Sequence, residues 1–221
     1  MKIDVSKTVF VFDLDDTLYM EYDYHKSGVC ALVTKINELF PATKKNKLEE
    51  IIMGNNEDFL GEICKYLNLP VTFKESLLWE YRLHTPNISL LKEVHDLLDF
   101  LLNKSLGVSI ITDGRILTQK KKLSALGLEH IPVYISEEYG AEKPDLERFK
   151  KVSSQFSNCQ FVYLGDNPKK DFIAPNLLNW ITVGVRASVK NIHSQDLMGL
   201  DNSCLPNIWI KRIEDLKDYL C

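Results

Sequence analysis

The sequence lacks most of the features that mark a specialised class of protein. Its five cysteines are scattered, odd in number and without a Cys-x-x-Cys pair, which argues against a disulfide framework or a zinc site. A formal net charge of −4 gives no sign of a nucleic-acid-binding surface. Apolar runs stay well short of the ~20 residues of a membrane span, and the N-terminal run is too short for a signal peptide and ends in Asp13. We therefore expect a soluble, cytoplasmic protein with reduced thiols that binds neither nucleic acid nor a membrane.

Internal repeats and low-complexity segments are also absent, and short apolar runs recur in their place. These runs are rich in β-branched and aromatic residues and are apolar throughout rather than alternating. That pattern is typical of parallel strands covered on both faces. We expect strands at residues 9–12, 108–112, 133–136, 161–164 and 180–183, with a last short strand and a helix near the C-terminus.

Helical stretches separate these runs. Residues 89–104 carry a stripe of apolar side chains at helical spacing. Residues 116–126 are followed by Gly127, a good helix-ending residue, and Pro144 is expected in the first turn of a helix over residues 145–155. Strands that alternate with helices predict an α/β fold with a doubly wound parallel sheet.

One long segment breaks this alternation. Residues 20–86 show no clear strand but four amphipathic stretches, at 23–40, 42–53, 57–67 and 73–84. We expect them to form a small helical bundle, inserted into a core made of residues 1–19 and 87–221. The clustered lysines at positions 44, 45, 47 and 120–122 are interpreted as solvated helix faces.

Acidic residues follow the ends of three expected strands. Asp13, Asp113 and Asp166 each come directly after an apolar run or one residue later. Ligands of open α/β sheets bind outside the carboxyl ends of the strands, so these acids should meet at one edge. Carboxylates repel each other and are costly to bury, and a metal ion would let them lie together. A set of carboxylates without thiols suits Mg²⁺.

The acids after the first strand can take separate chemical roles. Asp13 and Asp15 are two residues apart, so on an extended strand they face the same side. One can attack phosphorus, and the other can protonate the leaving oxygen and later deprotonate a water molecule. Because a free Asp has a pKa of ~3.9, the second role needs surroundings that raise its pKa. Lys143 can supply a positive charge to a phosphoryl group, and Thr112 a hydroxyl and a backbone N–H.

Four motifs, in this order along the chain, resemble those of the haloacid dehalogenase (HAD) superfamily. They are Asp13-Leu14-Asp15-Asp16-Thr17, Thr112-Asp113-Gly114, Lys143-Pro144, and Gly165-Asp166 with Asp171. Each motif alone is a weak signal, but the four together, at strand ends or in the loops after them, are a strong one. The helical insertion is similar to the small C1 cap of that superfamily. Two positions depart from the pattern, since many relatives have Gly in place of Asp16 and Asn in place of Lys170.

The resemblance implies a role for each matching residue. Asp13 would be the nucleophile, Asp15 the general acid and base, and Thr112 and Lys143 would hold the transferring phosphoryl group. Mg²⁺ would be bound by the Asp13 carboxylate, the Asp15 main-chain carbonyl and Asp166. Asp171 would bind the metal through water or orient Lys143. Substrate contacts are expected at Asp113, Gly114, Tyr22 and His25, although Tyr22 and His25 could equally be surface or core aromatic residues of the first cap helix. The departure at Asp16 is interpreted as a turn residue.

The expected reaction is hydrolysis of a small phosphorylated metabolite, with a sugar phosphate favoured over a polyol phosphate or a nucleoside monophosphate. Dehalogenation is disfavoured, because chloride leaves without a proton and dehalogenases of the superfamily lack the second Asp. A phosphomutase on the same core, and a non-catalytic binding or regulatory protein, are the alternatives. Both a monomer and a homodimer are left open.

Overall fold

The structure is a computed structural model that describes residues 1–54, 58–188, 191 and 195–221. The chain forms two compact units. One consists of Met1–Tyr22 and Ser89–Cys221, and the other of Asp23–Ile88. Within the described residues, no helix is long and apolar enough to cross a membrane.

The first unit is built on a six-stranded parallel sheet with the order β3-β2-β1-β4-β5-β6. β1 lies at its centre, where Phe12 is in register with Ile110 of β2 on one side and with Leu164 of β4 on the other. The expected doubly wound α/β fold is therefore confirmed. The strands are β1 Thr8–Phe12, β2 Gly107–Thr112, β3 Val133–Ile135, β4 Gln160–Gly165, β5 Ile181–Val185 and β6 Ile208–Ile210.

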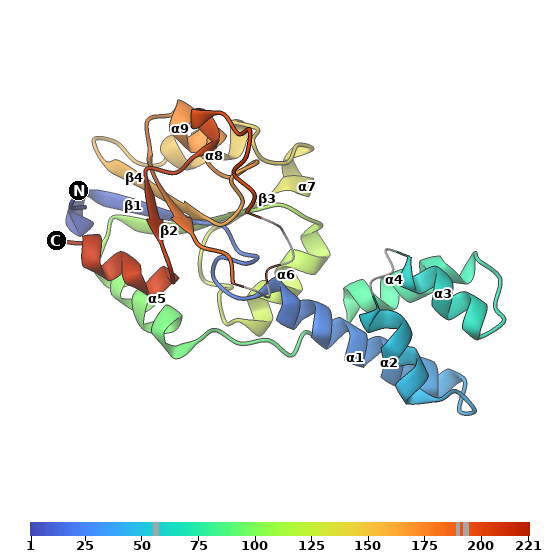
Figure 1. Ribbon diagram of the computed structural model, residues 1–221. Helices are drawn as coiled ribbons and strands as arrows, with labels where there is room; N and C mark the ends of the chain where they lie inside the picture. Colours follow the sequence, from blue (N-terminus) through green and yellow to red (C-terminus); the bar gives the residue numbers. More distant parts are fainter. Residues whose placement is uncertain (55–57, 189–190, 192–194) are drawn as a thin grey trace. The chain divides into compact units, whose positions relative to one another are not determined.

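Helices cover both faces of this sheet, with α8 and α9 on one side and α5 on the other (Figure 1). Val9 and Val11 of β1 pack in one buried cluster with Phe149 of α8. Phe10 and Phe12 alternate with them and are fully buried too, which is why β1 is apolar at every position. The helices of this unit are α5 Lys92–Lys104, α6 Ile116–Ala125, α7 Ser136–Tyr139, α8 Glu147–Ser153 and α9 Ile173–Leu177, with 3₁₀ helices η1 Val5–Lys7, η2 Asn202–Cys204 and η3 Ile213–Tyr219.

The helix after Pro144 begins later than the sequence suggests. The Lys143–Pro144 peptide bond is cis, and α8 starts only at Glu147. Residues 142–145 instead form a turn in which the Asp145 N–H donates to the Glu142 carbonyl (3.0 Å). The Asp145 carboxylate then accepts a hydrogen bond from the Glu147 N–H (2.8 Å), so Asp145 precedes the helix rather than lying in it. The expectation that Pro144 sits in the first helical turn is wrong.

The second unit is an all-helical bundle. Its helices match the four amphipathic stretches closely, although the start of the third stretch, residue 57, lies outside the described residues. Leu32, Val33 and Ile36 of α1 pack with Leu48 and Ile63 in a buried apolar core. The helices are α1 Glu21–Leu39, α2 Lys45–Met53, α3 Phe59–Tyr66 and α4 Phe73–Leu83.

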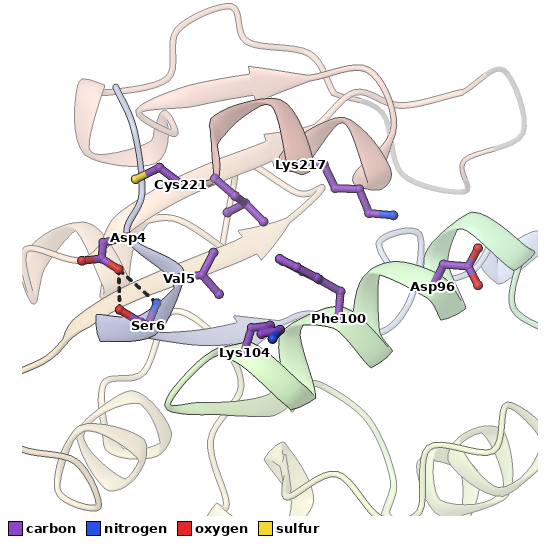
Figure 2. Close-up of a pocket in the computed structure, with 9 residues that line it drawn as sticks. Asp4, Val5, Ser6, Asp96, Phe100, Lys104, Lys217 and Cys221 are labelled. Atoms are coloured by element: carbon purple, nitrogen blue, oxygen red, sulfur yellow. Dashed lines mark hydrogen bonds between the residues drawn. The ribbon is translucent and has the colours of Figure 1, made fainter.

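The ends of the chain meet at the edge of the first unit. The Ile3 N–H donates to the Tyr219 carbonyl (2.8 Å), and the Cys221 N–H donates to the Ile3 carbonyl (2.9 Å). A pocket of about 880 Å³ lies beside them, where Val5 and Phe100 point toward the space between α5 and η3 (Figure 2). Its walls carry none of the acids predicted for the site.

Candidate active site

The strand order brings the predicted acids together. Because β2 and β4 both pair with β1, the residues that follow these three strands lie at one edge of the sheet. The Asp13 N–H donates to the Leu164 carbonyl (2.8 Å), which continues the pairing of β1 with β4 by one residue. A small pocket of about 80 Å³ opens there, lined by Asp13, Asp15, Glu21, Thr112, Asp113, Asp166, Asn167 and Lys170.

Lys143 is the buried cation that contacts Asp13. Its Nζ lies 2.6 Å from Asp13 Oδ1, 2.6 Å from Asp171 Oδ1 and 3.1 Å from the Tyr163 hydroxyl. The side chain is 1% exposed. Burial alone would lower the pKa of Lys143, but the charges of Asp13 and Asp171 outweigh it and hold the pKa well above its usual value. Lys143 is therefore a fixed ammonium group beside Asp13.

Asp171 is paired with Lys143 and does not line the pocket. Besides the ion pair, its Oδ2 accepts a hydrogen bond from the Asn167 N–H (2.7 Å). Gly165 makes this possible, because a Cβ at that position would lie 2.7 Å from Asp171 Oδ2. Of the two roles expected for Asp171, this geometry favours the orientation of Lys143.

The buried acids are crowded enough to favour a cation. Carboxylate oxygens of Asp13, Asp166 and Asp171 lie within 4.8 Å of one another. Burial, with the neighbouring carboxylates adding to it, raises the pKa of Asp166 to about 9. Burial also raises the pKa of Asp13 to about 7, against the opposing charge of Lys143. An oxygen-only cluster of this kind fits Mg²⁺, and Asp13, Asp166 and Asp171 are the residues that could hold it.

These shifts predict a pH-dependent stability. Because the pKa of Asp166 rises from its ordinary 3.8 to about 9, the folded state binds this proton more tightly than the unfolded state does. Without a metal, this stabilisation is complete below about pH 4 and is lost as the pH rises through about 9. Mg²⁺ competes with the proton, so it should raise the melting temperature more at pH 8.5 than at pH 5.5. At about 100 times its Kd, a ligand stabilises by about 2.7 kcal/mol.

Thermal unfolding with Mg²⁺ or with a chelator, at both pH values, measures this effect. Asp166→Asn serves as the control and should remove most of the Mg²⁺ response. An equal Mg²⁺ shift at both pH values would contradict the assignment of the acidic cluster as the metal site.

Asp15 is held by three side chains. Its Oδ1 accepts from Lys122 Nζ (2.7 Å) and from the Tyr19 hydroxyl (2.5 Å), and its Oδ2 accepts from Gln119 Nε2 (2.9 Å). Burial acts to raise the pKa of Asp15, but the charge of Lys122 and these hydrogen bonds outweigh it and lower the pKa. The raised pKa that the acid role seemed to need is not found, because a buried lysine faces the carboxylate.

That lysine corrects the interpretation of the cluster at 120–122. Lys120 is exposed, but Lys122 is only 4% exposed. Gln119, Lys122, Leu123 and Leu126 are spaced as one helix face, and all four are buried. The helical spacing of these four residues is visible in the sequence. Because Gln119 and Lys122 are polar, however, the pattern does not indicate a buried face.

The second motif is fixed by protein donors. Thr112 Oγ1 accepts from Gln119 Nε2 (2.6 Å), and Asp113 forms ion pairs with Arg148 (2.7 Å) and Lys170 (3.1 Å). Burial acts to raise the pKa of Asp113, but the nearby lysines and Arg148 outweigh it and lower the pKa. Arg148 is itself fully buried, although nothing in its sequence context marks it as a site residue. Gly114 takes a φ of 136°, which explains why this position is glycine.

The residues from Asp16 to Tyr22 agree with expectation at Asp16 and differ from it in which side chain lines the pocket. Asp16 has a φ of 55° and accepts a hydrogen bond from the Glu21 N–H (2.9 Å), so it is the turn residue expected. Glu21, rather than Tyr22, lines the pocket, and burial raises the pKa of its carboxyl to about 7. Tyr22 is half-buried.

His25 belongs to the helical unit. Its Nδ1 lies 2.8 Å from the Tyr81 hydroxyl, and its ring packs edge-on against Phe59. This arrangement matches the alternative interpretation of His25, as a packed residue of the first cap helix.

A model of the haloacid dehalogenase-like hydrolase family matches residues 10–185. No match was found among curated proteins.

Several solved structures share the fold at low sequence identity. YfnB from Bacillus subtilis, described as a HAD-hydrolase bound to magnesium, is 18% identical, with a TM-score of 0.65 over 96% of this chain and 98% of that one. A protein of Haemophilus somnus described as a predicted phosphoglycolate phosphatase is 18% identical, with a TM-score of 0.62 over 97% of each chain. A Thermotoga maritima protein assigned as a β-phosphoglucomutase is 16% identical, with a TM-score of 0.63 over 96% of this chain and 97% of that one.

Proposed function

The chain belongs to the haloacid dehalogenase-like hydrolases, and we propose that it is a Mg²⁺-dependent phosphatase acting on a small phosphorylated metabolite. The observation that carries this proposal is the pairing of Asp13 and Asp15 in one pocket, with the Lys143 ammonium 2.6 Å from Asp13. Such a pocket offers a nucleophile, an acid-base group and a charge for a phosphoryl group.

Asp13 is the proposed nucleophile. One of its carboxylate oxygens forms a bond to phosphorus while the bond from phosphorus to the leaving oxygen breaks. Lys143 sits against Asp13 Oδ1 and, with the hydroxyl and backbone N–H of Thr112, supplies positive charge and hydrogen bonds to the equatorial phosphoryl oxygens. The pocket volume of about 80 Å³ suits a phosphoryl group and leaves the rest of a substrate outside it.

Asp15 is the proposed acid-base group. Because Lys122 lowers the pKa of Asp15, the proton for the first step must be taken up when the negatively charged phosphoryl group binds beside Asp15 and raises that pKa. Asp15 then gives this proton to the leaving oxygen and, in the second step, takes one from water. That water attacks phosphorus, the bond between Asp13 and phosphorus breaks, and inorganic phosphate is released. This residue favours phosphate esters over haloacids as substrates, because a halide leaves without a proton.

Mg²⁺ is the proposed cofactor, held by the carboxylates of Asp13 and Asp166 and the main-chain carbonyl of Asp15. When bound, it neutralises the acidic cluster and withdraws charge from the phosphoryl group. Magnesium in the structure of YfnB supports this choice, as does the oxygen-only character of the cluster here.

The substrate is proposed to be a hydroxylated metabolite, with a sugar phosphate favoured. Glu21 and Lys170 line the pocket beside the reacting groups and offer both a hydrogen-bond acceptor and a donor to polar substituents. The helical unit is proposed as a cap that closes over the substrate. The movement between domains described for YfnB supports that role.

A phosphomutase is the second candidate, favoured by the structural likeness to a protein assigned as a β-phosphoglucomutase. It would use the same first step and then return the phosphoryl group to a sugar hydroxyl instead of water. The two outcomes differ in product, since only the hydrolase releases inorganic phosphate.

The test is inorganic phosphate release from a panel of sugar phosphates, polyol phosphates, nucleoside monophosphates and phosphoglycolate, with Mg²⁺ or with a chelator. A haloacid in the same panel tests dehalogenation. We expect Mg²⁺-dependent release from one class of phosphate ester and no halide release. Isomerised sugar phosphate without free phosphate would favour the mutase, and halide release would contradict the proposal.

A further inference from the structure

The carboxylate of Asp15 lies in a cage of side chains from outside its own motif. Lys122 and Gln119 reach it from α6, which follows β2, and Tyr19 reaches it from four residues further along the chain. Lys122 and Gln119 are both less than 5% exposed. None of these three residues belongs to the four motifs.

The three contacts use most of the hydrogen-bonding capacity of the carboxylate. An ionised carboxylate has about four acceptor sites. Two donors occupy Oδ1 and one occupies Oδ2, so the remaining capacity lies on Oδ2. Because Asp15 lines the pocket, that site is the one left to exchange a proton with a substrate or with water.

Stability alone gives little reason for a lysine at position 122. Burying an ion pair is often no better for stability than burying apolar side chains of similar size. The adjacent positions of the same helix face, Leu123 and Leu126, are apolar, and a Met at 122 would suit that face. A Met side chain, however, has no hydrogen-bond donor or positive charge for the Asp15 carboxylate, which Lys122 supplies.

We infer that Lys122 and Gln119 are positioning residues that fix the Asp15 carboxylate for proton exchange with the substrate, with Tyr19 as their third member. The inference rests on the proposed phosphatase function and assigns to α6 a part in it. Thr112 Oγ1 lies 2.6 Å from the same Gln119 amide nitrogen, so α6 also links the acid-base group to the phosphoryl-binding motif.

The leaving group provides a specific test. In the first step Asp13 bonds to phosphorus, the leaving oxygen departs, and an alkoxide needs the proton from Asp15. A p-nitrophenolate is stable enough to leave without that proton. If Lys122 positions Asp15, Lys122→Met should slow phosphoryl transfer from an alkyl phosphate far more than from p-nitrophenyl phosphate. A general acid contributes about 10²- to 10⁴-fold, and we expect at least about 10-fold greater loss with the alkyl ester.

The experiment is rapid-quench measurement of a single turnover with both esters, together with kcat and KM. Lys121→Met, one residue earlier on the same helix and half-exposed, is the matched control and should behave as wild type. Lys122→Arg should recover part of the loss. Tyr19→Phe removes one hydroxyl and keeps the ring, so it should show the same selectivity more weakly, and it covers the case in which Lys122→Met does not fold.

Selective loss with the alkyl ester, in kcat rather than KM, supports the inference. Equal loss with both esters, or a folded Lys122→Met variant as active as wild type, overturns it and leaves the phosphatase intact. A wild-type protein that turns over p-nitrophenyl phosphate and none of the phosphate esters of the panel above, or none of these esters at all, overturns the proposed function, and this role of Lys122 falls with it.

Discussion

Replacement of Asp13 by Asn is expected to lower phosphate release by about 10³-fold or more, the scale on which the loss of a covalent nucleophile acts. Asn has nearly the same shape as Asp but cannot attack phosphorus with a carboxylate oxygen. The Lys143 ammonium keeps its partner Asp171, 2.6 Å away, so the fold should persist. Steady-state phosphate release and thermal unfolding of the same preparations measure both effects.

Asp99→Asn is a suitable control for this variant, because Asp99 is exposed on α5 of the same unit. It should leave turnover unchanged. Turnover by Asp13→Asn within tenfold of wild type, with the fold intact, would show that Asp13 is not the nucleophile.

Replacement of Lys143 by Met is expected to affect stability and activity together. It leaves the buried carboxylates of Asp13 and Asp171 without their shared cation, and breaking a buried ion pair in this way costs about 3–5 kcal/mol. Phosphate release should also fall by about 10²-fold or more, because a charge aimed at the phosphoryl group is gone. Urea unfolding in the presence of a chelator measures the first effect, and phosphate release measures the second.

The effect of added Mg²⁺ on the stability of Lys143→Met tests this prediction further. A cation bound by Asp13 and Asp166 would replace part of the lost charge, so the stability difference between Lys143→Met and wild type should shrink when Mg²⁺ is added. Lys169→Met, at an exposed lysine, is the control. A loss below about 1 kcal/mol for Lys143→Met, which is the range of a surface ion pair, would contradict the description of Lys143 as a buried structural cation.

Much of the fold follows from local patterns in the sequence. Continuous apolar runs such as Val9 to Phe12 are buried on both faces of a parallel sheet, and the pattern predicts that directly. The rule that ligands bind at the carboxyl ends of strands predicts that Asp13, Asp113 and Asp166 meet, because β1 lies between β2 and β4.

The residues that surround this core of the site are harder to predict. Lys122 and Arg148 are charged residues in helices, where exposure is the usual outcome, and only their long-range partners Asp15 and Asp113 explain why they are buried. Such features depend on contacts between segments far apart in sequence, which local propensity does not contain.

The segment just after the first motif illustrates the same limit. Its many polar and aromatic residues made Tyr22 and His25 candidates for substrate contact. The structure puts Glu21 in the pocket lining and pairs His25 with Tyr81 in the helical unit. Which of several neighbouring side chains faces a pocket depends on where a helix begins, and sequence patterns fix that only to within a few residues.

The central claim is that catalysis passes through a phosphoryl group on Asp13, and covalent trapping tests it most directly. Wild type and Asp15→Asn are mixed with ³²P-labelled p-nitrophenyl phosphate, whose leaving group needs no proton from Asp15, then quenched in acid and mapped by peptide mass spectrometry. Label is expected on the peptide that contains Asp13, with more label in Asp15→Asn because the water that releases phosphate is no longer deprotonated. Turnover without any labelled protein, or label at a residue other than Asp13, would contradict the central claim.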